Sequence, residues 1–251
     1  MPEAETKTAE DRRPARPRIW EVDVLRGVAI ILMILYHLGF DLQEMSGIRS
    51  FLGLRFDITS HGISIAQYFF AGVFVVLSGI SSTLSHDNIR RGLKLLAVAV
   101  LVTIVTYVYS PSMAIHFGIL HCLAVSILLY GLLFSRSRWL TDAVWGAAFV
   151  GLGLALPAIL RGVSVRFDWL LPIGITSPTY SSYDYFPLLP WFGIFLLGVA
   201  LGKTVYASGT SLVPLRLPAN PICWAGRHSL WIYILHQPLL LGILYLLGLV
   251  R

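Results

Sequence analysis

Seven apolar stretches alternate with short polar segments along the chain, and each stretch is long enough to cross a bilayer. A spanning helix needs about 20 mostly apolar residues, and no stretch shows the alternation typical of an outer-membrane strand. The pattern predicts an all-α, multi-pass transmembrane bundle of about seven helices. The predicted spans are 22–42, 63–84, 92–109, 115–134, 140–160, 186–206 and 228–249.

Composition supports a surface that faces lipid. Of the 251 residues, 56% are hydrophobic and 13% are charged, and the mean hydropathy is +0.74. Soluble domains carry nearer 25% charged residues, so the bilayer is the expected partner. The net charge of +6 lies mostly in the N-terminal tail and the loops between apolar stretches. Membrane topology explains such charges, and no nucleic-acid partner is expected.

Basic residues also set the predicted orientation. With the N-terminus inside, fourteen Lys and Arg fall on the cytoplasmic side and five on the outer side. This places the N-terminus in the cytoplasm and the protein in the cell membrane. Residues 1–18 are almost free of apolar side chains and are predicted to be a disordered cytoplasmic tail. Residues 19–251 then form one transmembrane domain, which is compatible with a homo-oligomer.

The first predicted helix carries four ionisable residues on one stripe about 60° wide. They are Asp23, Arg26, His37 and Asp41. Ionisable groups within a membrane helix are costly and are therefore candidates for function. His37 and Asp41 are four residues apart and can touch, as a general base and its orienting carboxylate do. The alternative is a polar contact that only holds helices together.

Three further histidines extend the candidate catalytic set. His121 and His236 lie within other predicted helices, and His61 precedes the second helix on the outer side. No P-loop, HExxH or GxSxG motif occurs, which disfavours nucleotide hydrolysis, zinc proteolysis and α/β-hydrolase chemistry. No metal is expected. A metal or heme site on His37, His121 and His236 would require all three side chains to lie at the same depth in the membrane, and His236 is expected to lie deeper than the other two.

A basic cytoplasmic face suits a phosphorylated donor such as coenzyme A. Arg26, beside Asp23, could bind a phosphate, and Arg90 and Arg91 lie on the same predicted side. Positive-inside topology also explains these charges. On the outer side, residues 161–185 are rich in polar and aromatic side chains, which suit a sugar or form an interfacial aromatic belt. The candidate substrate-binding residues there and just beyond are Tyr183, Asp184 and Trp191.

Five sequence strings together resemble one known family. In this order they resemble the heparan-alpha-glucosaminide N-acetyltransferase catalytic-domain family of prokaryotes, one of the transmembrane acyltransferases, over about residues 18–250. The strings are EVDVLRGVAIILMILYHLGFDL (21–42), FVVLSGISSTLS (74–85), FGILHCLAVSILL (117–129), DYFPLLPWFGIFLLGVALG (184–202) and GRHSLWIYILHQPLL (226–240).

The resemblance implies an enzyme that takes acetyl from cytoplasmic acetyl-CoA and delivers it to a sugar-like acceptor on the outer side. His61 is the nearest match to the family's important histidine, while His37 stands where eukaryotic members carry Asn. His37 or His61 would act as base, with His121 and His236 lining the path or stabilising an oxyanion. Direct and two-step transfer both stay open. A proton-coupled permease and a structural membrane protein are the alternatives.

Overall fold

The predicted helical membrane bundle is confirmed by a computed structural model of the chain. It describes residues 19–249 except 52–53, 56, 59 and 214–219, so the predicted tail 1–18 lies outside the described residues. Within them, six helices are long and apolar enough to cross a membrane. These are α1 (Trp20–Ser46), α2 (His61–Leu84), α3 (Asn88–Tyr109), α5 (Trp139–Ile159), α6 (Leu188–Val205) and α8 (Ser229–Leu246).

The predicted span 115–134 is shorter than expected. It is α4 (Ile119–Leu129) continued by a π-helical turn, η3 (Tyr130–Phe134). The helix begins at Ile119, because Gly118 is extended and the Asp184 carboxylate accepts a hydrogen bond from the Ile119 backbone N–H at 2.9 Å. A start at residue 115 was therefore wrong, and the chain from α3 to α4 is a longer connection than predicted.

Short elements complete the described chain. The helix α7 (Pro221–Arg227) is capped by Asn220, whose side chain accepts a hydrogen bond from the Ile222 N–H at 2.8 Å. The short elements are the hairpin β1 (Ser50–Phe51) with β2 (Leu54–Arg55), the 3-10 turns η2 (Pro111–Met113) and η4 (Leu171–Ile173), and α7 (Pro221–Arg227).

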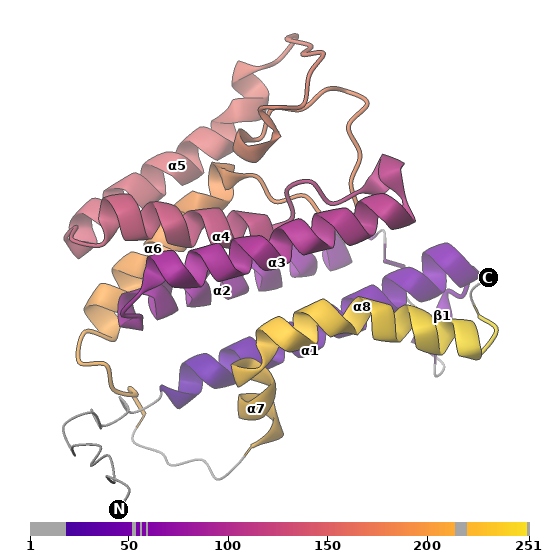
Figure 1. Cartoon of the computed structure of the whole chain (residues 1–251), viewed down its shortest axis with the longest axis horizontal. Coiled ribbons are helices and arrows are strands. Elements are labelled where there is room, and N and C mark those ends of the chain that lie inside the picture. The colour runs from indigo at the N-terminus through magenta and orange to yellow at the C-terminus, as the bar shows by residue number, and fades with distance from the viewer. Residues whose placement is uncertain (1–18, 52–53, 56, 59, 214–219, 250–251) are drawn as a thin grey trace, which may run out of the picture.

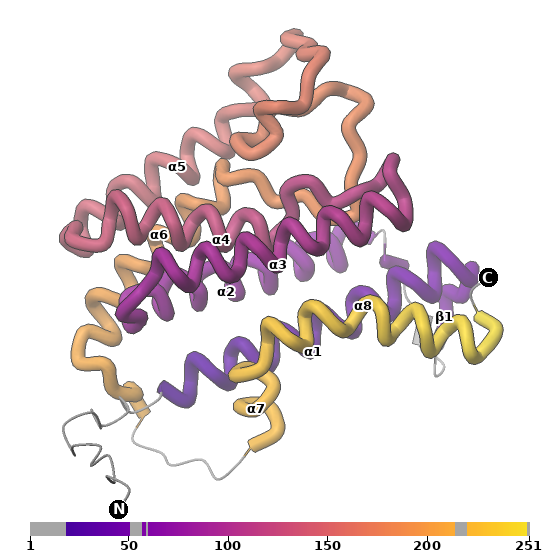
Figure 2. The backbone as a smooth tube through the Cα atoms, viewed as in Figure 1, coloured from indigo at the N-terminus to yellow at the C-terminus, as the bar shows by residue number. Residues whose placement is uncertain are grey.

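Helices α2, α4 and α6 form the centre of the bundle (Figure 1). Helix α5 packs on α6, α3 packs on α4, and α1 packs on α2, while α8 runs beside α1 (Figure 2). The core contains Val75, Ile127 and Phe195, which are fully buried. Leu and Val side chains on the outer helix faces stay exposed, as lipid contact requires.

Small residues let helices approach closely where the site is built. A Cβ on Gly79 of α2 would lie 2.2 Å from the Phe195 carbonyl oxygen of α6. A Cβ on Gly226 of α7 would lie 1.8 Å from the Asp23 carbonyl oxygen of α1. Close backbone packing at small residues is the usual way in which membrane helices associate. It holds α7 against the start of α1 and so fixes where α8 begins.

A buried ion pair joins α5 to α6. Lys203 Nζ lies 2.7 Å from Asp142 Oδ2, and the Asp142 side chain is fully buried. The same ammonium donates to the carbonyl oxygens of Ser137 at 2.9 Å and Phe134 at 3.2 Å. The connection between η3 and α5 is thereby held against the end of α6.

Candidate active site

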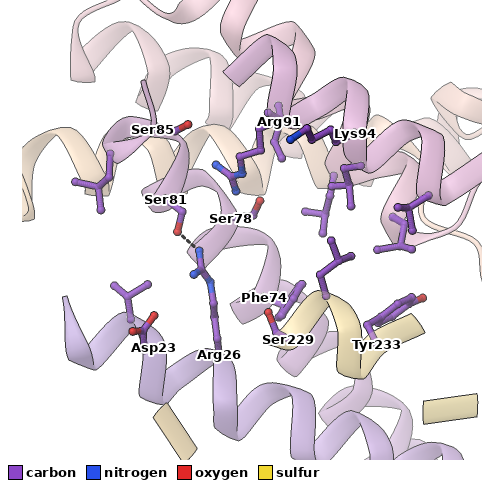
Figure 3. A pocket seen from close by; sticks show the side chains of 18 of the residues that line it. Asp23, Arg26, Phe74, Ser78, Ser81, Ser85, Arg91, Lys94, Ser229 and Tyr233 are labelled. Carbon is purple, nitrogen blue, oxygen red and sulfur yellow. Dashed lines mark hydrogen bonds between the residues drawn. The ribbon is translucent and has the colours of Figure 1, made fainter. Parts of the chain in front are cut away.

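A cavity of about 1000 Å³ lies among α1, α2, α3, α4 and α8. Its walls come from the start of α1, the end of α2 and the starts of α3 and α8, so it lies at the end of the bundle predicted to be cytoplasmic (Figure 3). Toward α4 the wall is apolar and is formed by Leu120, Leu123 and Ile127. A charged group and an apolar arm could therefore occupy different parts of the same cavity.

Four cationic side chains line the cavity, against two carboxylates. The cations are Arg26, Arg90, Arg91 and Lys94, and the carboxylates are Asp23 and Asp87. Both carboxylates are engaged: Asp23 lies 3.5 Å from Arg227 Nε, and Asp87 caps α3 by accepting from the Arg90 N–H at 2.8 Å.

Two of the three cavity arginines, Arg26 and Arg91, form hydrogen bonds with α2. Arg26 donates to the Ser81 hydroxyl and to the Leu77 carbonyl oxygen, the latter at 3.4 Å. Arg91 donates to Ser82 Oγ at 3.2 Å. Figure 3 shows Arg26 and Arg91 approaching the same wall of the cavity from α1 and α3. Guanidinium groups fixed this way suit a phosphate, which binds their planar donors.

Tyr233 of α8 also lines the cavity (Figure 3). Its hydroxyl donates to Asp184 Oδ2 at 3.4 Å, and the same oxygen accepts the Ile119 N–H at 2.9 Å. Burial raises the pKa of Asp184 to about 6, and the hydrogen bonds from Ile119 and Tyr233 offset part of that rise. Tyr233 thus connects the lining of the cavity to a partly buried carboxylate.

The segment that carries Asp184 is fixed against the connection before α4. The Tyr183 N–H donates to the Met113 carbonyl oxygen at 2.9 Å, and the Phe186 N–H donates to Phe117 at 3.0 Å. A Cβ on Gly118 would lie 2.2 Å from Asp184 Oδ2. The carboxylate therefore reaches the start of α4 only because residue 118 has no side chain.

Beyond Tyr233, a polar cluster joins α8 to α1. His236 Nδ1 lies 2.5 Å from the Tyr233 carbonyl oxygen, and the His236 and His37 ring centroids are 4.9 Å apart. Both Asp41 oxygens accept from the Gln237 amide at 3.0 Å. Among the described residues, His236 Nε2 and Gln237 Oε1 are buried and have no hydrogen-bond partner. These two atoms are therefore available to form hydrogen bonds with a bound molecule.

Two expectations about this cluster were wrong. In the described part of the chain no hydrogen bond joins His37 to Asp41, because α8 places Gln237 against the carboxylate and His236 against the imidazole. His236 is also not deeper than His37, since the two rings are neighbours. His121, the third histidine considered for a metal, lies elsewhere, with Nε2 3.1 Å from Thr103 Oγ1.

The remaining predicted residues are spread over the molecule. Of the five predicted donor-binding residues, only His236 does not line the cavity; Asp23, Arg26, Arg90 and Arg91 do. His61 is the exposed first residue of α2. Tyr183 is 47% exposed, whereas Trp191 is buried in the core, 4.8 Å from Phe186 between ring centroids.

Tyr233 and Gln237 belong to the site but were not predicted from the sequence. The signal was present: Tyr233 is three residues before His236 and shares its helix face. Tyrosine and glutamine are uncharged, so the cost of burying a charge in a membrane helix does not mark them as candidates for function.

A protein-family model described as heparan-alpha-glucosaminide N-acetyltransferase, catalytic, matches residues 18–238. The match spans every residue of the cavity and of the polar cluster. No curated protein and no solved structure matches the chain.

Proposed function

The chain belongs to the heparan-alpha-glucosaminide N-acetyltransferase catalytic family, and on that premise we propose that it moves acetyl from cytoplasmic acetyl-CoA to an outer acceptor. Family membership indicates a membrane acetyltransferase. The proposal adds the donor, the direction of transfer, a sugar-like amine or hydroxyl as acceptor, and the cell membrane as the location.

The basic cavity is the observation that carries the proposal. Acetyl-CoA has a phosphorylated nucleotide end and a long, weakly polar arm that ends in a thioester. Arg26, Arg91 and Lys94 supply cations for the phosphates, and the wall formed by Leu120 and Leu123 suits the arm. The thioester would then reach the part of the cavity that Tyr233 lines.

The acceptor would approach from the opposite end of the bundle. There His37 and His236 are in contact, and Asp41 is held by Gln237. Either imidazole could bind or orient the acceptor, since no described residue forms a hydrogen bond with His236 Nε2. His61 and His121 stay candidates for the same side, and Tyr183 and Trp191 stay candidates for acceptor binding.

Labelled acetyl-CoA added to the purified protein in liposomes, with amino sugars sealed inside, tests the proposal. Only protein whose cavity faces the outer solution meets the donor, so acetylated amino sugar should accumulate inside. A sugar that crosses the membrane without being acetylated would support the permease instead. Absence of both donor binding and acetylation, over a panel of amino sugars and hydroxyl acceptors, would contradict the enzyme.

The cavity cations can be tested by one substitution. Arg91→Gln keeps a hydrogen-bond donor but removes the charge, and we expect KM for acetyl-CoA to rise about tenfold, as loss of a charge-assisted contact predicts. Arg136→Gln is the matched control, because Arg136 is exposed at the same end of the bundle and does not line the cavity. Equal KM values for the two variants would remove the cavity as the donor site.

A further inference from the structure

We infer that Asp184 and Tyr233 carry the proton of the transfer reaction, Asp184 taking it from the acceptor amine and Tyr233 passing it to the departing CoA sulfur. The inference rests on the proposed function and adds a catalytic pair to it. It also gives Asp184 a chemical task in place of simple acceptor binding.

Tyr233 is placed between the two halves of the reaction. Its side chain lines the cavity proposed for the donor, and its hydroxyl is hydrogen-bonded to Asp184 at 3.4 Å. Asp184 belongs to the connection between α5 and α6, on the side predicted to be outer. A hydroxyl between the cavity and a carboxylate can move a proton from one to the other without opening a passage.

One oxygen of Asp184 is available for this task. Both hydrogen bonds that the carboxylate accepts, from Ile119 and Tyr233, end on Oδ2. Oδ1 accepts no hydrogen bond from the described residues. The Ile119 N–H therefore fixes the group by one oxygen and leaves the other with lone pairs for an incoming amine proton.

The chemistry balances with these two residues alone. The amine nitrogen attacks the thioester carbonyl carbon, forming the N–C bond, and the C–S bond breaks. The surplus N–H proton goes to Asp184, the Tyr233 hydroxyl gives its proton to the CoA thiolate, and Asp184 returns a proton to Tyr233 through their hydrogen bond. Acetyl-CoA and amine give N-acetyl amine and free CoA, with both residues restored.

The protonation state of Asp184 suits a base. Its titratable neighbours are Tyr233 from α8, Tyr180 from its own segment and Cys122 from α4, and none carries a positive charge. With a pKa of about 6, the carboxylate is ionised at pH 7 and accepts a proton more readily than an ordinary Asp, whose pKa is near 4. Activity should fall as pH drops below about 6.

The competing explanation is structural: Asp184 would serve only to cap α4. Asp184→Asn separates the two, because an amide oxygen can still accept the Ile119 N–H but the side chain cannot take the proton. Tyr233→Phe removes only the hydroxyl. The matched controls are Asp168→Asn, whose carboxylate accepts the Ser177 N–H at 2.7 Å in the same connection, and Tyr245→Phe on the exposed face of α8.

We expect Asp184→Asn to lower kcat at least 100-fold, as loss of general-base catalysis does, with KM for acetyl-CoA within twofold of wild type. The wild-type profile of kcat/KM against pH should show an acid limb near pH 6, and any residual activity of Asp184→Asn should lack it. Tyr233→Phe should lower kcat about tenfold and keep the limb. Both control variants should match wild type.

Unchanged kcat in Asp184→Asn, or an acid limb that survives in it, overturns the inference. So does a parallel loss of acetyl-CoA binding and kcat, which is the result of a structural role. If Asp184→Asn does not fold, Tyr233→Phe decides: wild-type kcat there overturns the inference. A wild-type protein that binds no acetyl-CoA and acetylates no acceptor overturns the proposed function itself, and the pair with it.

Discussion

Substituting Gly118 by Ala moves the Asp184 carboxylate without changing any functional group. The added Cβ would lie 2.2 Å from Asp184 Oδ2, 2.7 Å from Ile115 Cγ2 and 2.9 Å from Asp184 Cγ. An ordinary contact is about 3.5 Å, so the carboxylate must retreat by about 1 Å. The Ala backbone itself is unstrained, because φ at residue 118 is −86°. Displacement is therefore the main effect of the substitution.

Two contacts weaken when the carboxylate retreats. The 2.9 Å bond to the Ile119 N–H stretches, which costs about 1 kcal/mol of stability, as loss of a helix cap does. The hydrogen bond to Tyr233 is already long at 3.4 Å, so we expect the displacement to break it. A misplacement of about 1 Å in a catalytic geometry can lower the rate about 100-fold, so we expect kcat to fall by that order.

Acetyl transfer by purified protein should be measured together with acetyl-CoA binding and thermal unfolding in detergent. We expect kcat to fall, donor affinity to stay within twofold, and the melting temperature to drop by a few degrees. Gly151→Ala is the control, since a Cβ there meets nothing within 4 Å. If kcat of Gly118→Ala equals that of Gly151→Ala, the position of Asp184 does not matter for catalysis.

Three other predictions follow from the same structure. Lys203→Met leaves the Asp142 carboxylate buried without its cation, so the free energy of unfolding should fall by about 3–5 kcal/mol, which thermal unfolding can measure. Gly79→Ala puts a Cβ 2.2 Å from the Phe195 carbonyl oxygen, and its melting temperature should lie well below that of Gly62→Ala, whose Cβ meets nothing. Raising the salt from about 0.1 M to about 1 M shortens the Debye length from about 10 Å to about 3 Å, so KM for acetyl-CoA should rise, whereas a salt-independent KM would argue against phosphate binding by the cavity cations.

The polar stripe on the first helix could be predicted because helical geometry alone decides it. Leu25, Val28, Ile31 and Leu35 lie on the opposite side of α1 from the stripe, and all four are exposed. Burial of Asp41 to 2% exposure follows from the same periodicity. Helix positions could also be predicted, since long apolar stretches have few alternatives in lipid.

The partners of the stripe could not be predicted, because they depend on how other helices cross it. Periodicity places His37 and Asp41 on one face but does not say that α8 will bring Gln237 to the carboxylate. The bond between Tyr233 and Asp184 joins residues 49 positions apart. Such contacts depend on the close packing of α7 against α1, where Gly226 admits the Asp23 backbone, and no local pattern encodes that approach.

The position of Tyr233 also bears on the choice between enzyme and permease. A permease needs a passage through which its cargo can move, with gates that open in turn. Here Tyr233, which lines the basic cavity, is hydrogen-bonded to the carboxylate of Asp184. The proposed phosphorylated donor would be held by the cavity cations, and its acyl arm would approach Tyr233. In the proposed reaction only an acetyl group and a proton would move between the two molecules, so neither molecule would need a passage through the bundle, and this arrangement favours the enzyme over the permease.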